Sequence, residues 1–294
     1  MAIIPSLFMN AVVALGIDLP EDKKQWIGTG FIVGRRETDN PSLSTYYIIT
    51  NKHVVSNRCR LFVRFNYLGK DLIKDYPIEL LDISGNKLYS SHIDEKTDII
   101  AIQIIPQTLI KDKSIWGAFD LDSHTLTLEQ MEKTGVVEGG LVYALGFPMN
   151  LVGILKAPIC RLGCIARISD AFTRDKFKEK TTYLVDTQTF PGNSGGPIIY
   201  RPEETSIVGT PAQTNANLIG ILSAYIPYQE TLYSQQTGRI RMFQEENSGL
   251  TIVYPVDRIK EVVEQEWQRI ERQKSENQQL ESPVLKATDG KVPK

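Results

Sequence analysis

The chain has 294 residues, enough for one large domain or two small ones with a sizeable buried core. Hydrophobic residues make up 41% and charged residues 23%, as in ordinary soluble globular proteins, and the formal net charge is −2. No basic stripe with interleaved aromatic residues is present, and no apolar run is long enough for a membrane-spanning helix, so we expect neither a nucleic-acid nor a membrane partner. The oligomeric state stays open.

Residues 1–20 are apolar but do not have the layout of a signal peptide. No Lys or Arg precedes Lys23, and Pro5 and Asn10 interrupt the apolar run. Segment 10–16 is better explained as a first buried strand. We therefore expect a cytoplasmic protein.

Three cysteines are few for a chain of this length. Cys160 and Cys164 are close in sequence but have no further Cys or His nearby that would complete a zinc site. Reduced thiols in a reducing compartment are the favoured interpretation, with a Cys160–Cys164 disulfide as the alternative. We expect no metal and no cofactor.

Short β-rich runs separated by turn residues follow one another along most of the chain, a pattern typical of a β-barrel or sandwich. Regular alternation with amphipathic helices is missing, which argues against a doubly wound sheet. The predicted strands are residues 30–33, 46–50, 60–65, 98–105, 140–145, 163–167, 183–185, 196–200, 218–225 and 249–253.

Three longer segments connect these strands. Residues 107–136 fit a linker between two halves. Residues 201–217 and 226–248 exceed the usual length of a loop, so we expect each to be either functional or surface decoration.

The C-terminal end changes character after Pro255. Apolar residues recur there at helical spacing with charged residues between them, which predicts an amphipathic helix over about 255–272 packed on the body of the protein. From about 273 to 294 large apolar residues are few, and we expect a disordered tail. The apolar positions of the helix are Val256, Ile259, Val262, Val263, Trp267 and Ile270.

The segment 190–197 contains one serine, Ser194, among three glycines and two prolines, between the β-rich runs 182–185 and 198–200. Such a segment forces a sharp turn, leaves backbone N–H groups outside any strand ladder, and presents the hydroxyl at its tip. A serine hydroxyl is a poor nucleophile alone, so this interpretation needs a base and an acid that orients the base.

Chain order separates two classes of hydrolase. Residues 192–196 also fit the G-x-S-x-G pattern of α/β-hydrolases, in which the catalytic histidine follows the serine. The three histidines, His53, His92 and His124, all precede Ser194, so that arrangement is excluded. The order His, Asp, Ser stays available.

His53 is the candidate base, because it follows an apolar strand that can hold its side chain rigidly. His92 and His124 lie in polar sequence and are expected at the surface. Asp98 begins the apolar run 99–102, where a carboxylate needs a partner, and the Nδ1–H of His53 would supply one.

Five motifs together resemble the trypsin-like (chymotrypsin-fold) serine proteases, and most of all the bacterial branch with the high-temperature-requirement (Deg) proteases and glutamyl endopeptidases. The similarity spans about residues 8–265, and we expect no peptide-binding domain of the kind that many Deg proteases append. The motifs are Gly28-Thr29-Gly30-Phe31-Ile32-Val33, Thr50-Asn51-Lys52-His53-Val54-Val55, Thr97-Asp98-Ile99-Ile100-Ala101, Gly146-Phe147-Pro148 and Pro191-Gly192-Asn193-Ser194-Gly195-Gly196-Pro197.

The resemblance implies a mainly β fold within a peptidase domain over residues 1–272: two six-stranded antiparallel β-barrels, about 8–110 and about 136–254, and a C-terminal α-helix. It also implies catalytic roles for Ser194 as nucleophile, His53 as base and Asp98 as the group orienting it. The oxyanion hole would be the N–H groups of Gly192 and Ser194. The implied substrate pocket contains Gln188, Ser223, Ala224 and Tyr225.

The expected activity is that of an intracellular, narrowly specific serine endopeptidase acting on a protein or peptide. Two alternatives stay open: a non-catalytic protease-like binding module, disfavoured by the complete triad, and an esterase with the same triad. Asn193 stands where zymogen-type relatives have an aspartate, so we do not expect activation by N-terminal processing.

Overall fold

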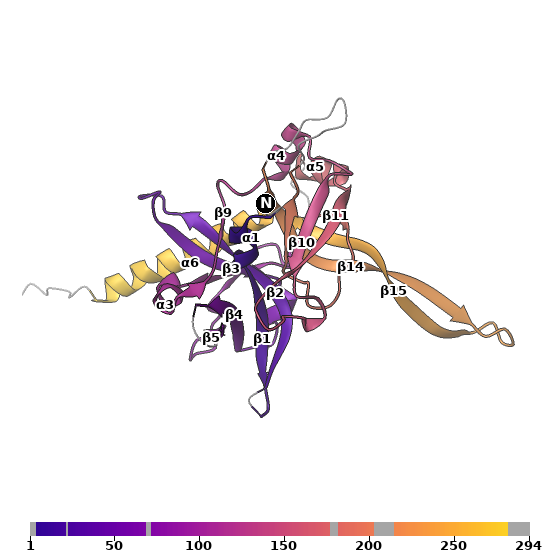
Figure 1. Ribbon diagram of the computed structural model, residues 1–294, viewed down its shortest axis with the longest axis horizontal. Helices are drawn as coiled ribbons and strands as arrows, with labels where there is room; N and C mark the ends of the chain where they lie inside the picture. The colour runs from indigo at the N-terminus through magenta and orange to yellow at the C-terminus, as the bar shows by residue number, and fades with distance from the viewer. Residues whose placement is uncertain (1–3, 22, 69–71, 177–181, 203–214, 282–294) are drawn as a thin grey trace, which may run out of the picture.

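The computed structural model describes residues 4–21, 23–68, 72–176, 182–202 and 215–281 (Figure 1). Two mainly antiparallel β structures follow each other along the chain, and a long C-terminal helix packs on both. The predicted fold class, mainly β and chymotrypsin-like with a C-terminal helix, is confirmed.

The N-terminal half forms a nine-stranded sheet with the main path β5-β4-β1-β2-β3-β7-β6, while β8 pairs with β4 and β9 with β2. This path is open, whereas the resemblance implied a closed six-stranded barrel. The edge strand β6 has only two residues, because residues 82–97 are rich in turn-forming and charged side chains. The elements are α1 (Ser6–Ala11), β1 (Val12–Leu19), β2 (Lys23–Arg36), β3 (Ser44–Thr50), α2 (Lys52–Val55), β4 (Arg60–Tyr67), β5 (Ile73–Glu79), β6 (Ser90–Ser91), β7 (Ile100–Ile104), α3 (Pro106–Lys111), β8 (Ser114–Ile115) and β9 (Phe119–Asp120).

The C-terminal half is a closed six-stranded antiparallel barrel, as predicted, and its strand order is β10-β11-β12-β15-β14-β13. The predicted linker 107–136 is structured: it contains α3, α4 and two short strands, and its Thr125 bridges to Leu218 of the barrel. The elements are α4 (Leu128–Thr134), β10 (Leu141–Gly146), the 3₁₀ turn η1 (Pro148–Asn150), β11 (Ile159–Arg167), α5 (Ser169–Lys176), β12 (Tyr183–Asp186), β13 (Pro197–Tyr200), β14 (Asn217–Tyr233) and β15 (Ile240–Pro255).

Strands β14 and β15 continue beyond the barrel as a two-stranded ribbon, residues 225–248, which we call the arm (Figure 1). The expectation that 226–248 is a loop is therefore wrong. A signal was present in the sequence, because β-prone residues flank a turn at 234–239 in which Gly238 has a φ of +65°. Of the other long connection, residues 203–214 lie outside the described part of the chain.

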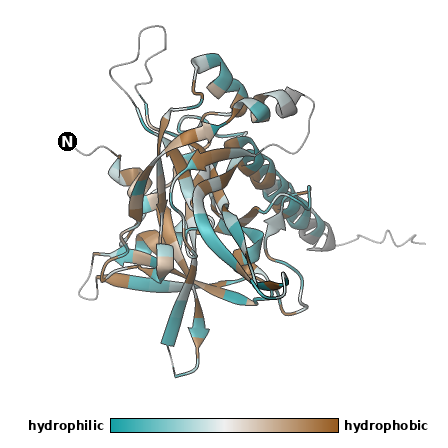
Figure 2. Cartoon of the chain, turned by 90° about the vertical axis from the view of Figure 1, so that its right-hand side faces the viewer, coloured by the Kyte–Doolittle hydropathy of each residue, from teal (hydrophilic) through white to brown (hydrophobic). Residues whose placement is uncertain are grey.

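Helix α6 (Val256–Glu281) packs its predicted apolar face on the body of the protein, and Figure 2 shows its outward side as hydrophilic. The guanidinium of Arg35 lies over the ring of Trp267, 4.1 Å from its centroid. The helix continues to Glu281 rather than ending near 272, so the predicted start of a disordered tail at about 273 is too early. The rest of the predicted tail, residues 282–294, lies outside the described residues.

Lys156 connects the segment after η1 to the N-terminal sheet. Its side chain is buried, and its ammonium donates hydrogen bonds to the carbonyls of Asn10 (3.1 Å) and Val12 (2.7 Å). Asn66 of β4 brackets its backbone, accepting from the Lys156 N–H at 2.7 Å and donating to its carbonyl at 2.8 Å. Burial lowers the pKa of Lys156 from 10.5 to about 7.

This buried lysine predicts a pH-dependent stability. Between about pH 7 and 10.5 the unfolded chain binds a proton at Lys156 that the folded protein does not, so the free energy of unfolding rises with pH across this window. Lys156→Met should remove that part of the slope. Urea unfolding of both proteins at intervals from pH 7 to pH 10 measures it, and parallel profiles would contradict the prediction.

Candidate active site

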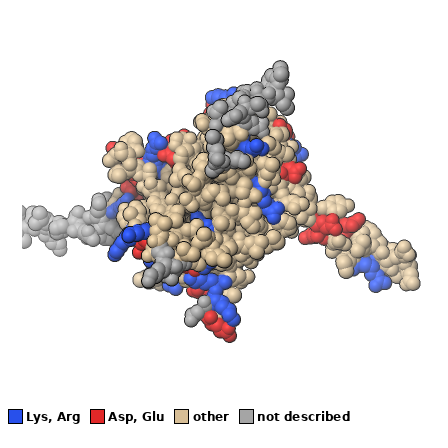
Figure 3. Space-filling model, viewed as in Figure 1, with Lys and Arg blue, Asp and Glu red and all other residues tan. Residues whose placement is uncertain are grey.

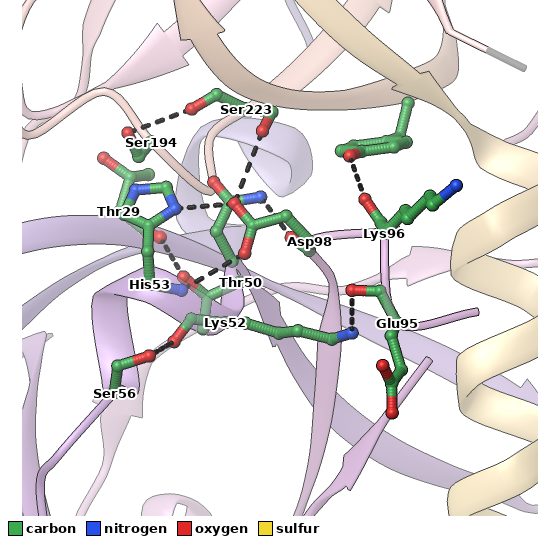
Figure 4. Close-up of polar contacts among 12 residues, drawn as sticks. Thr29, Thr50, Lys52, His53, Ser56, Glu95, Lys96, Asp98, Ser194 and Ser223 are labelled. Atoms are coloured by element: carbon green, nitrogen blue, oxygen red, sulfur yellow. Dashed lines mark hydrogen bonds and ion pairs between the residues drawn. The ribbon is translucent and has the colours of Figure 1, made fainter. Parts of the chain in front are cut away.

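Strand pairing brings the predicted triad residues together from separate elements (Figure 4). His53 lies in α2, directly after β3, and Asp98 lies just before β7. Because β3 pairs with β7, with Thr50 opposite Ile100, the residues at these strand ends become neighbours. Ser194 comes from the turn between β12 and β13 of the other half.

The imidazole of His53 is held by Asp98. Its Nδ1 lies 2.6 Å from Oδ2 of Asp98, and its backbone N–H donates to Oδ1 at 3.2 Å. Asn51 fixes the backbone beside the carboxylate by donating from Nδ2 to the Asp98 carbonyl at 2.7 Å. The histidine side chain is 51% exposed and the aspartate 25%, so the acid is the more enclosed partner. With Nδ1 occupied by Asp98, Nε2 is the ring nitrogen left for a substrate or nucleophile.

Ser194 lies on the side of the His53 ring opposite Asp98 (Figure 4). Its hydroxyl donates to the carbonyl of Ser223 at 3.2 Å, and the hydroxyl of Ser223 in turn donates to Oδ2 of Asp98 at 3.4 Å. In this conformation the Ser194 hydroxyl is therefore directed at strand β14. Among the described residues, no hydrogen bond joins this hydroxyl to His53.

The turn before Ser194 has the geometry of a type II β-turn. The N–H of Asn193 donates to the carbonyl of Phe190 at 3.0 Å, and Gly192 has a φ of +98°. A Cβ at position 192 would also lie 2.4 Å from the carbonyl oxygen of Phe147. The turn therefore requires glycine at this position for two reasons, backbone conformation and space.

Two hydrogen bonds orient the peptide groups of this turn. The N–H of Met149 donates to the Pro191 carbonyl at 2.7 Å, and the hydroxyl of Thr29 donates to the Gly192 carbonyl at 2.6 Å. In a trans peptide the N–H points opposite to the carbonyl, so the Gly192 N–H points away from Met149. Within the described part of the chain, neither this N–H nor that of Ser194 donates to a protein acceptor.

Met149 itself has a φ of +53°, uncommon for a residue with a side chain. Sequence reasoning did not identify Met149 as part of the site. It also did not single out Thr29, although Thr29 lies within one of the quoted motifs and its hydroxyl accepts the Phe147 N–H at 3.0 Å. Local sequence carries no signal for either contact, because both join segments far apart in the chain.

The other two histidines differ from the surface residues expected. His92 is buried, with Nε2 2.6 Å from the Glu261 carboxylate of α6 and Nδ1 accepting from the Asp94 N–H. His124 is half-buried and accepts from the Asp120 N–H at 3.1 Å. Both are bonded to structural groups away from Ser194.

The predicted pocket residues are only partly brought together. Ser223, Ala224 and Tyr225 follow one another on β14 beside Ser194, with Ser223 buried and Tyr225 36% exposed. Gln188 is exposed, so it is not enclosed at the base of a pocket, contrary to the assignment from the resemblance.

Threonines are the buried polar residues next to Gln188. Thr187 and Thr189 are buried on either side of it, and the Thr251 hydroxyl lies 3.0 Å from that of Thr189 and donates to the Thr187 carbonyl. Successive residues of an extended segment face opposite sides, so Gln188 faces outward where Thr187 and Thr189 face inward. The buried polar side chains beside Gln188 are therefore uncharged.

Two further observations delimit the chemistry of the site. No group of three or more His, Cys, Asp or Glu side chains among the described residues has the geometry to hold a metal ion. Over the same residues, none of the helices combines the length and apolar character needed to cross a membrane.

Comparison with known proteins gives the family. The model of the family described as trypsin-like peptidase domain matches residues 28–209, a span that contains His53, Asp98 and Ser194. The chain belongs to this family and is, at that level, a trypsin-like protease with the chymotrypsin fold. Among solved structures it is similar to the apo protease domain of MamO from Magnetospirillum magneticum, with a TM-score of 0.44 and 16% identity, covering 87% of this chain and 97% of that one. No curated protein matches the chain.

The contacts of Thr29 predict the effect of removing its hydroxyl. Thr29 is fully buried, so Thr29→Val leaves the Gly192 carbonyl and the Phe147 N–H without their partner, at a cost of about 1–3 kcal/mol of unfolding free energy. We also expect slower labelling of Ser194 by a fluorophosphonate, because the turn loses an anchor. Thr29→Ser keeps the hydroxyl and is the control. Equal stability and equal labelling in the two variants would contradict this role.

Proposed function

We propose that this protein is a serine endopeptidase that hydrolyses peptide bonds through a Ser–His–Asp triad and an acyl-enzyme. The observation that carries the proposal is the 2.6 Å contact between Nδ1 of His53 and Asp98, with Ser194 on the other side of the ring. The glycine turn beside Ser194, whose N–H groups at Gly192 and Ser194 have no acceptor among the described residues, supports it as well.

In the proposed reaction the Ser194 oxygen attacks the carbonyl carbon of the scissile peptide bond, and Nε2 of His53 takes the hydroxyl proton. Asp98 stabilises the resulting imidazolium and keeps the ring oriented. The N–H groups of Gly192 and Ser194 donate to the oxyanion; loss of one such donor typically costs about 10²–10³-fold in rate. His53 then protonates the leaving amine, and a water deprotonated by His53 releases the acyl group from Ser194.

One observation keeps a second candidate open, a non-catalytic protease-like binding module. The hydroxyl of Ser194 donates to the Ser223 carbonyl rather than to His53. Catalytic hydrogen bonds are often misaligned before substrate binds, so this observation is compatible with either function. Reaction with a fluorophosphonate separates them, because only an activated serine is labelled quickly.

The cytoplasm is the proposed location. The thiols of Cys59, Cys160 and Cys164 are all free, and the first two are exposed. Exposed free thiols are typical of reducing compartments.

The proposed mechanism predicts the effect of changes to the triad. Ser194→Ala and His53→Ala should each abolish peptide hydrolysis with the fold intact, because His53 is exposed and Ser194 half-buried. Asp98→Asn should lower kcat by up to about 10⁴-fold, because it stabilises the wrong imidazole tautomer. Hydrolysis assays paired with circular dichroism measure this. Activity that persists in Ser194→Ala, purified free of other proteases, would refute the mechanism.

The pocket predicts specificity for small or medium uncharged residues before the scissile bond. The residues proposed to line it, Ser223, Ala224 and Tyr225, and the buried threonines beside Gln188 are uncharged, so a Lys or Arg entering it would lose hydration without an ion pair. Cleavage of a proteome-derived peptide library, analysed by mass spectrometry, measures the preference. Tyr225→Gly should extend it to larger side chains. A dominant preference of the native enzyme for Lys or Arg would overturn this assignment.

A further inference from the structure

The arm extends away from the barrel (Figure 1), and within the described part of the chain most of its β15 side chains are exposed rather than packed on the body of the protein. Every β15 residue from Ile240 to Ser248 is exposed, including Phe243 at 64% and Met242 at 59%. A two-stranded ribbon is marginally stable in water, and three or more strands are usually needed. An isolated arm with exposed aromatic and aliphatic side chains therefore indicates that another strand covers it.

One edge of the arm is well suited to accept that strand. Strand β15 pairs with β12 only through residues 250–253, so within the described chain its outer edge is unpaired from 240 to 247. Natural sheets protect exposed edges with proline, lysine, short strands or bulges. Strand β14 contains Pro227 next to a register shift, whereas residues 242–247 of β15 pair with β14 without a shift and contain no proline or lysine; the bulge of β15 lies at Arg241, near the tip of the arm.

The charges of β15 are complementary to those of its own antiparallel copy. Around Phe243, the sequence Arg241-Met242-Phe243-Gln244-Glu245 begins with a cation and ends with an anion. If two such strands pair antiparallel about a two-fold axis at Phe243, each Arg241 lies opposite Glu245 of the other copy, and Phe243 lies opposite itself. Phe243 and Glu245 share a face of the sheet because they alternate along the strand, and Arg241, the extra residue of a β-bulge opposite Tyr233, is the next residue in this series beyond Met242.

Neither charge is neutralised within the chain. Arg241 and Glu245 are four residues apart, about 13 Å along a strand, too far for an ion pair. Glu245 accepts a hydrogen bond from Gln229 at 2.6 Å, and no ion pair among the described residues includes either group. Opposite charges are also separated along the arm as a whole, with acidic side chains gathered at its base and basic ones nearer its tip (Figure 3). Two antiparallel arms therefore place opposite charges together.

We propose that β15 of the arm pairs antiparallel with β15 of a second copy of this chain, about a two-fold axis at Phe243. The two arms then form one four-stranded sheet across a symmetric dimer, which covers both unpaired edges of β15. A second copy is favoured over an unrelated partner because one strand supplies both halves of the charge pattern, as a symmetric isologous interface requires.

Sedimentation equilibrium of the full chain tests the proposal. We expect a mass of twice 33.1 kDa for the native chain at high concentration. The proposed contact is small, so we expect a weak dimer. The measurement therefore covers a series of protein concentrations up to about 300 µM chain. Arg241→Glu and Glu245→Arg should each raise the dimer Kd by about tenfold or more, since each places like charges opposite one another. Glu230→Arg, on β14 of the same arm, is the matched control and should leave the Kd unchanged.

Mixing the two single variants is the decisive step. An Arg241→Glu chain carries two glutamates at these positions and a Glu245→Arg chain two arginines, so each is repelled by its own kind but complements the other. An equimolar mixture should form a heterodimer, with both chains folded by circular dichroism. A native chain that stays at 33.1 kDa over the whole series overturns the proposal, as does a dimer that the variants do not weaken or whose mixture does not associate.

Discussion

The proposed active site depends on the hydrogen bonds by which one residue of the N-terminal sheet holds the serine turn of the barrel. Thr29 donates its N–H to the Ser194 carbonyl at 3.0 Å, and its carbonyl accepts the Thr50 hydroxyl at 2.7 Å. Its own hydroxyl donates to Gly192 and accepts from Phe147. Thr29 is buried between the halves, where an unpaired polar group is costly, so these bonds fix how the halves meet. That placement sets Ser194 against His53.

The same close approach explains the glycines of the serine motif. A Cβ at Gly195, where φ is +85°, would lie 2.1 Å from the Thr29 carbonyl oxygen. A Cβ at Gly196 would lie 2.3 Å from the carbonyl of Leu145 on β10. Backbone therefore packs directly on backbone around Ser194, which leaves no space for side chains and keeps the turn rigid.

The parts of the fold that depend on local sequence could be predicted, whereas those that depend on distant contacts could not. The strands of the closed barrel and the apolar face of α6 follow from hydrophobic periodicity, and His53 and Asp98 follow from their place at strand ends. Residues 226–248 exceed the usual length of a loop, and only their β-prone composition indicates the arm. The burial of His92 does not follow from its polar neighbours in sequence, because its partner, Glu261, lies far along the chain. For the same reason no sequence pattern pointed to Lys156, whose acceptors belong to the N-terminal segment.

Mass spectrometry of the chain after reaction with a fluorophosphonate tests the central claim most directly, because it asks whether the assembled geometry activates one particular hydroxyl. The account predicts a single adduct per chain, mapped by peptide sequencing to Ser194 and absent from the His53→Ala variant. A chain that stays unmodified, or an adduct on a different residue, would contradict the account.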